Sequence, residues 1–182
     1  SKDTGLRVKD TAQKLVQQGK FMGGAAPYGY ELKPSGQISK HGRALHHLVI
    51  VSERADVVRH IYDLSLSKEF GSSKIASILN EDKYYKSLAP KDVWKSGTIT
   101  SILTNPIYAG YVAYKRRERI NGKYHRLDSN DWIKSNAPNI DIQIIDEDTW
   151  NRTQEKRKRR SEKYTQILKH QNITVIKRND GM

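Results

Sequence analysis

The sequence has 182 residues, of which 36% are hydrophobic, so the chain can form one domain or two small ones around a modest core. Its 33 Lys and Arg against 20 Asp and Glu give a formal net charge of +13, and a domain this basic attracts polyanions such as nucleic acid. The absence of cysteine excludes disulfides, thiolate zinc sites and cysteine nucleophiles within these residues, and no apolar run is long enough to span a membrane. We therefore expect a cytoplasmic protein with no membrane partner.

The first part of the chain combines a short helical pattern with a long stretch rich in glycine. Apolar residues recur at helical spacing up to Gly19, which predicts a polar connector helix within residues 1–19. Residues 20–43 mix Gly and Pro with aromatic and basic side chains, which predicts an irregular loop. Lys20, Tyr28 and Tyr30 can contact a sugar–phosphate backbone there, although the residues alone slightly favour burial of both tyrosines in the core.

Three short helices are predicted in the middle of the chain. An apolar run at 48–51 suggests a strand, and a helical period follows from Ser52, the candidate N-cap, to about residue 67. A second helix is predicted for residues 72–80. After a loop that contains several aromatic residues, a third helix opens at Ser96 or Gly97 and is stopped by Pro106.

The order of these helices resembles a helix-turn-helix, although the loop from Glu81 to Lys95 is far longer than a minimal turn. In such motifs the N-terminal part of the last helix enters the major groove of DNA. The polar and basic residues of that helix, which can donate to phosphates and base edges, are Lys95, Ser96, Thr98, Thr100, Ser101 and Thr104. The alternative is a solvated polar face on an ordinary helical bundle, and the pattern alone favours neither.

The hydrophobic period changes after Tyr108. Residues 111–114 are predicted to form a strand, and Asn121-Gly122 is typical of a type I′ hairpin turn. Residues 123–127 would then be the return strand, with a third short strand at 132–133. Asp146 can cap a helix that begins near Glu147 and continues past residue 168.

Basic residues cluster at two places in this second half of the chain. Lys115, Arg116 and Arg117 lie beside the predicted hairpin, where they can contact DNA. The run Lys156–Arg160 is interpreted as a solvated helix face or a linker, because most such runs are exposed to water.

The sequence contains no pattern typical of a metal site or an independent active site. His41, His46 and His47 lie close together, but no cysteine or carboxylate accompanies them at metal-site spacing. Acidic residues 146–148 stand at a predicted helix start, where acids serve for capping. Neither a nucleophile elbow nor a Walker phosphate-binding loop occurs. We therefore expect no metal, no cofactor and no catalytic residue in this chain.

Several segments together resemble the recombinase domain of large serine recombinases, the family of phage integrases and transposon resolvases. The resemblance rests on their order and spacing rather than on any one of them. The segments are Pro27–Tyr30, Glu53–Tyr62, Ile75–Asn80, Trp94 followed by Thr98–Gly110, and Ile144–Asp146 before Trp150.

The resemblance implies a parent protein of three parts. An N-terminal domain would hold the serine that attacks DNA, and the helix at 1–19 would leave that domain. A zinc-ribbon domain and a coiled coil would follow, so residues 108–182 would include the start of the zinc-ribbon region before its metal ligands. The parent would act as a dimer or tetramer on double-stranded DNA, in the cytoplasm of a bacterium, and would be encoded by the bacterium or a phage.

The resemblance also favours residues 98–104 as the helix that reads the major groove and the loop near Tyr28 as a contact close to the crossover site. The predicted fold is α+β, with a small, mainly helical DNA-binding domain at 20–107 and a β-hairpin plus basic helix at 108–182. The predicted function is sequence-specific binding at a recombination site, as the DNA-recognition part of a serine recombinase whose catalytic serine domain is absent from this fragment. The alternatives are a helix-turn-helix transcription regulator and a DNA-processing enzyme such as a nuclease.

Overall fold

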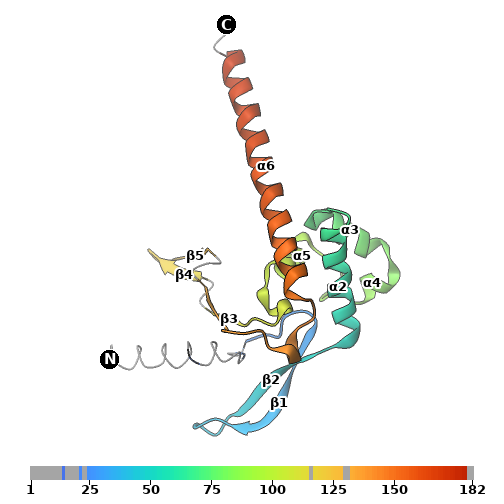
Figure 1. Cartoon of the computed structure of the whole chain (residues 1–182), viewed down its shortest axis with the longest axis vertical. Helices are drawn as coiled ribbons and strands as arrows, with labels where there is room; N and C mark the ends of the chain where they lie inside the picture. Colours follow the sequence, from blue (N-terminus) through green and yellow to red (C-terminus); the bar gives the residue numbers. More distant parts are fainter. Residues whose placement is uncertain (1–13, 15–20, 22–23, 115–116, 129–131, 180–182) are drawn as a thin grey trace.

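The computed structural model describes residues 14, 21, 24–114, 117–128 and 132–179. Figure 1 shows the arrangement of its elements. In chain order they are β1 (Tyr30–Ile38), β2 (Ala44–Ile50), α2 (Ser52–Leu66), α3 (Ser72–Glu81), α4 (Lys83–Ser87), α5 (Ser96–Thr104), η1 (Pro106–Ala109), β3 (Ala113–Tyr114), β4 (Arg117–Ile120), β5 (Lys123–Arg126), β6 (Ile133–Lys134), η3 (Ile140–Ile142) and α6 (Glu147–Asn179). The predicted connector helix lies outside the described residues except for Lys14, which is helical. The predicted DNA-contacting residues Lys20, Lys115 and Arg116 also lie outside them.

The core lies where α2, α3 and α5 meet the first turns of α6 (Figure 1). Helices α2, α3 and α5 each bury a stripe of aliphatic side chains, as the helical period predicts, and this removal of apolar surface from water is the main stabilising term. Tyr30, Tyr62 and Tyr108 are almost completely buried. The ring centroid of Tyr108 lies 5.7 Å from that of Tyr30 and 6.3 Å from that of Tyr62. The three rings therefore join the N-terminal strand, α2 and η1 in one packed centre.

The three central helices occupy the predicted segments, with two local differences. Val51 occupies the N-cap position of α2, so Ser52 is the first helical residue rather than the cap. The predicted loop before α5 contains the short helix α4, whose first amides at Tyr84 and Tyr85 donate to the Asp82 carboxylate at 2.8 and 3.3 Å.

The prediction of an irregular loop at residues 20–43 is wrong for residues 30–38. Residues from Tyr30 onward form β1, which pairs antiparallel with β2 from Tyr30↔Ile50 to Ile38↔Ala44. Pro34 and Gly36 obscured the strand in the sequence. A two-stranded ribbon has a free edge on each strand, so it tolerates Pro34, and Gly36, with φ of +78°, lies where the register shifts.

The second half of the chain contains the predicted hairpin turn, but the strands pair differently. Asn121 and Gly122 both have positive φ, as a type I′ turn requires, and they join β4 to β5. The strand predicted at 111–114 is reduced to β3, which pairs with β6 rather than with the hairpin. Helix α6 begins as predicted, because the Asp146 carboxylate accepts from the Thr149 amide at 2.6 Å.

The boundary predicted between residues 107 and 108 falls inside the hydrophobic core. Tyr108, Ile142 and Ile144 pack with residues of α2 and α5. The amides of Ile144 and Ile145 both donate to the Tyr108 carbonyl at 2.9 Å. The helices before that boundary and the base of α6 therefore form one packed body. No helix in the described ranges combines the length and the apolar character needed to cross a bilayer.

Candidate nucleic-acid interface

Helix α5 divides its predicted polar residues between two flanks. Its core face is formed by Ile99, Ile102 and Leu103, all at most 2% exposed. Thr98 and Ser101 line a hollow on one flank. Thr100 lies on the opposite flank, where its hydroxyl is 2.8 Å from the Ser72 hydroxyl at the start of α3. The predicted DNA-binding residues between Lys95 and Thr104 therefore do not form a single surface.

The remaining predicted residues of α5 follow the same division. Lys95, at the N-cap, and Ser96 are exposed, and Lys95 lines the hollow on the first flank. Thr104 is half-buried, and its hydroxyl donates to the Thr100 carbonyl at 2.8 Å, so it is already satisfied within the helix. The residues that can offer free hydrogen-bonding groups to a ligand are concentrated near the start of α5.

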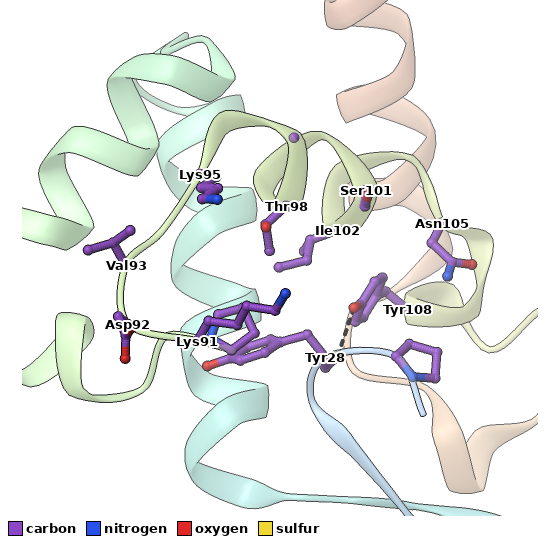
Figure 2. A pocket seen from close by; sticks show the side chains of 13 residues that line it. Tyr28, Lys91, Asp92, Val93, Lys95, Thr98, Ser101, Ile102, Asn105 and Tyr108 are labelled. Atoms are coloured by element: carbon purple, nitrogen blue, oxygen red, sulfur yellow. Dashed lines mark hydrogen bonds between the residues drawn. The ribbon is translucent and has the colours of Figure 1, made fainter. Parts of the chain in front are cut away.

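The hollow beside α5 has a volume of about 730 Å³. Figure 2 shows the residues that surround it. Thr98, Ser101 and Asn105 approach from the helix. Lys91 and Lys95 supply positive charge from the preceding loop, against one carboxylate at Asp92. We name this feature the α5 hollow; its mixture of hydroxyl, amide and ammonium groups can donate to phosphate and base oxygens.

The loop that borders the α5 hollow is fixed by Asn80 and Trp94. The Asn80 side chain accepts from the Trp94 amide at 2.7 Å and donates to the Trp94 carbonyl at 2.9 Å. Trp94 is 2% exposed, and its indole N–H donates to the Tyr85 carbonyl at 2.8 Å. These bonds hold both ends of the loop before α5. The sequence pattern gave no indication of the two Asn80–Trp94 hydrogen bonds, because the two residues lie 14 positions apart.

The two tyrosines of the predicted DNA contact have different positions. Tyr28 is half-buried at the α5 hollow, where its hydroxyl donates to the Leu88 carbonyl at 2.7 Å and burial raises its pKa to about 12. The Tyr108 hydroxyl donates to the Tyr28 carbonyl at 2.7 Å, which Figure 2 marks. Tyr28 thus forms part of the wall of the α5 hollow.

Tyr30 cannot contact DNA in this structure, so its assignment to the interface is corrected. The residue is 2% exposed. Its hydroxyl lies 2.6 Å from the Ile142 carbonyl and 3.1 Å from the Ile107 carbonyl, and burial raises its pKa far above the ordinary value. The side chain acts inside the core, which is the alternative that the residues alone favoured slightly.

Two β-ribbons carry further exposed positive charge. Arg117 is the first residue of β4, and every residue of β4 and β5 is exposed. The basic residues of this hairpin are Arg117, Arg119, Lys123 and Arg126, against one acid, Glu118. The β1–β2 ribbon exposes Lys33, Lys40 and Arg43. Both ribbons project from the helical body in Figure 1, a shape that can enter a DNA groove.

The basic run at the start of α6 is not the simple solvated face that the sequence suggested. Lys158 and Arg159 are exposed, but Lys156, Arg157 and Arg160 are half-buried against the helical body. Lys156 Nζ donates to the Leu66 carbonyl at 2.6 Å and to the Glu69 carboxylate at 3.0 Å. This contact closes the C-terminal end of α2. The tertiary partners come from about 90 residues earlier in the chain, so local patterning could not reveal them.

No cluster of three or more histidine, cysteine, aspartate or glutamate side chains suited to a metal ion occurs in the part of the chain that the structure describes. His46 and His47 are exposed on β2. Asp146 is engaged in capping, and its pKa is lowered mainly by the hydrogen bonds from Thr149.

Comparison with known proteins gives one family and several similar structures, two of which are described below. A family model described as Recombinase matches residues 52–160, which is more than half of the chain. The structure described as "Sequence Requirements of the Listeria innocua prophage attP site" aligns with a TM-score of 0.55 at 23% identity, covering 84% of this chain and 52% of that one. "Crystal Structure of a LSR-DNA Complex" aligns with a TM-score of 0.53 at 22% identity, covering 84% and 39%. This chain thus spans about half of the first structure and two fifths of the second, and both likenesses concern the fold.

Proposed function

This chain belongs to the Recombinase family, and from that premise we propose that it binds double-stranded DNA sequence-specifically at a recombination site. The observation that carries the proposal is the start of α5, where Lys95, Thr98 and Ser101 converge on the α5 hollow. The two similar structures are described in terms of a prophage attP site and a DNA complex, which supports the same partner class. The net charge of +13 supplies sequence-independent attraction to the DNA backbone.

In this proposal α5 lies in the major groove with its N-terminal half toward the bases. Ser101 and Thr98 offer hydroxyl groups that donate to or accept from base edges. Lys91 and Lys95 neutralise phosphates on the same side. The Asn80–Trp94 bonds support specificity indirectly, because they fix the loop that carries both lysines.

Strand cleavage and exchange belong, in this proposal, to a separate catalytic domain of a serine recombinase, whose serine attacks the DNA backbone. This chain recognises the site and positions that domain. Incubation of the chain with duplex DNA and Mg²⁺ should then give binding without nicking or a covalent adduct. Cleavage that depends on acidic residues of this chain would instead favour an independent nuclease.

The binding proposal is tested on the chain itself, with a site obtained by selection from random duplex DNA. Ser101→Asp places a carboxylate on the exposed face of α5, where it repels phosphates and cannot donate to a base. We expect it to abolish the preference for the selected duplex over a scrambled one in fluorescence anisotropy. Ser77→Asp is the matched control, because Ser77 is exposed on α3 and receives the same charge. Equal loss in both variants would remove α5 as the reader of sequence.

A further inference from the structure

A second hollow lies on the opposite flank of α5, between the start of α3 and the base of α6. It has a volume of about 350 Å³ and is lined by Gly71, Ser72, Arg157, Arg160, Ser161 and Tyr164. We name it the arginine hollow. Ser72 connects it to α5, because its hydroxyl is 2.8 Å from the Thr100 hydroxyl and 3.4 Å from Nη1 of Arg157.

Arg157 has no acidic partner in the described part of the chain. None of the ion pairs found there includes its guanidinium group. The side chain is half-buried, and its pKa is lowered first by that burial and then by the neighbouring charge of Arg160. A guanidinium group that has lost part of its hydration beside a like charge gains strongly from an anion.

Arg160 also lines the arginine hollow, and none of the ion pairs found in the described part of the chain includes it. Its guanidinium donates to the main-chain carbonyl of Glu69. The Glu69 carboxylate is itself engaged by Lys156 at 3.0 Å, and this contact, more than Arg160, lowers its pKa. Two fixed guanidinium groups, three residues apart on α6, therefore line one hollow whose nearby carboxylate already has a partner.

We propose that the arginine hollow binds one phosphate group of the DNA backbone, an inference that rests on the proposed function. Arg157 and Arg160 supply planar N–H donors that match phosphate oxygens, and Ser72 supplies a hydroxyl. The first residues of α3 border the same hollow, and the positive end of a helix dipole adds to the attraction of the arginines.

The position relative to α5 explains why the ligand is a backbone phosphate rather than a base. A helix in the major groove has a sugar–phosphate backbone along each side. The α5 hollow, with Lys91 and Lys95, lies on one flank of α5, and the arginine hollow lies on the other. The arginine hollow therefore contributes affinity for any duplex and does not discriminate between sequences.

Arg157→Gln is the direct test, and Lys158→Gln is its matched control because Lys158 is the exposed neighbour on the same helix. Anisotropy titrations with the selected and scrambled duplexes are run over a series of salt concentrations. We expect Arg157→Gln to weaken binding to both duplexes roughly tenfold and to reduce the slope of log K against log salt by about one. Lys158→Gln should change both quantities much less. Equal effects of the two substitutions would overturn the proposal.

A second measurement distinguishes the source of the phosphate and guards against a variant that does not fold. The melting temperatures of the wild-type chain, Arg157→Gln and Arg160→Gln are compared in inorganic phosphate and in chloride at equal ionic strength. Extra stabilisation of the wild type by phosphate, lost in either variant, supports the site. No extra stabilisation of the wild type overturns it even if neither variant folds.

The combination of both assays separates this inference from the proposed function. Arginine-dependent stabilisation by inorganic phosphate, with unchanged DNA affinity in Arg157→Gln, would show a site for a free oxyanion and overturn the assignment to DNA. A wild-type chain that binds no duplex would refute the proposed function itself. Normal DNA binding with no effect specific to Arg157 would refute only the arginine hollow.

Discussion

The hydroxyl of Tyr30 offers a decisive test of whether this residue belongs to the core or to the DNA interface. In Tyr30→Phe the ring and its packing against Tyr108 remain, while the bond of 2.6 Å to the Ile142 carbonyl and the weaker contact of 3.1 Å to the Ile107 carbonyl are lost. Both carbonyls belong to buried residues, and water cannot replace the hydroxyl there without disturbing the packing. Leaving a buried acceptor unsatisfied costs about 1–3 kcal/mol.

We therefore expect Tyr30→Phe to lower the free energy of unfolding by about 2 kcal/mol in urea titrations. For a chain of 182 residues this corresponds to a fall in melting temperature of about 4–8 °C. Tyr124→Phe is the control, because Tyr124 is 71% exposed and its substitution should change stability very little. DNA affinity measured well below the melting temperature should be the same in wild type and Tyr30→Phe. Unchanged stability together with weaker DNA binding would refute the core assignment and return Tyr30 to the interface.

Three further predictions concern the pH dependence, the loop before α5 and two glycines. Burial raises the pKa of Tyr30 and Tyr108 in the folded state above the ordinary value of 10.0. The stability that the two protonated hydroxyls contribute is therefore complete below pH 10 and declines as the pH rises further. Urea titrations should show that the free energy of unfolding declines less steeply above pH 10 in Tyr30→Phe than in the wild type. Asn80→Ala should lower the free energy of unfolding by about 1–3 kcal/mol in urea titrations and weaken DNA binding, because the N–H and C=O groups of Trp94 both lose their partner. Asn151→Ala, at an exposed position on α6, should leave both stability and DNA binding unchanged. Gly110→Ala should destabilise by about 2 kcal/mol or more in thermal melts, because φ is +91° and the new Cβ would lie 2.9 Å from the Asn139 carbonyl oxygen, while Gly97→Ala in the open first turn of α5 should stabilise by up to about 1 kcal/mol.

Each of these predictions has an outcome that would contradict it. A steeper decline of stability above pH 10 in Tyr30→Phe would oppose the assigned burial. Full stability of Asn80→Ala would mean that the loop before α5 is held by Trp94 packing alone. Equal melting temperatures for the two glycine variants would show that the close approach at Gly110 is relieved without cost.

The helices α2, α3, α5 and α6 were predictable from the sequence because each depends on local signals, whereas the short α4 was not predicted. The stripes of α2, α3 and α5, the Asn121-Gly122 turn and the Asp146 cap all lie within a few residues of their causes. The predicted strand at 48–51 corresponds to the end of β2, but β1 was missed because Pro34 and Gly36 break the alternation that normally indicates a strand. A ribbon with two free edges tolerates these residues, so local composition could not distinguish it from a loop.

The candidate site was predictable only in part, because its geometry depends on contacts between distant segments. Composition pointed to nucleic acid, and the helix order pointed to α5, but neither could assign Thr100 to one flank and Ser101 to the other. That division follows from the packing of α3 against α5 through the Ser72–Thr100 contact. The roles of Tyr30 and Lys156 depend on partners more than 75 residues away in sequence.

The two flanks of α5 make a prediction about how affinity and specificity separate. Substitutions at Ser101 change a group that can reach bases, so they should alter the ratio of affinities for selected and scrambled duplexes. Substitutions at Lys91 or Arg157, on opposite flanks, remove one phosphate contact each and should leave that ratio unchanged. If these two residues contact different strands of the backbone, as proposed, their losses in log K should add in the double variant, as expected for distant, independent sites. A large deviation from additivity would contradict the assignment of the two residues to separate phosphates on opposite flanks of α5.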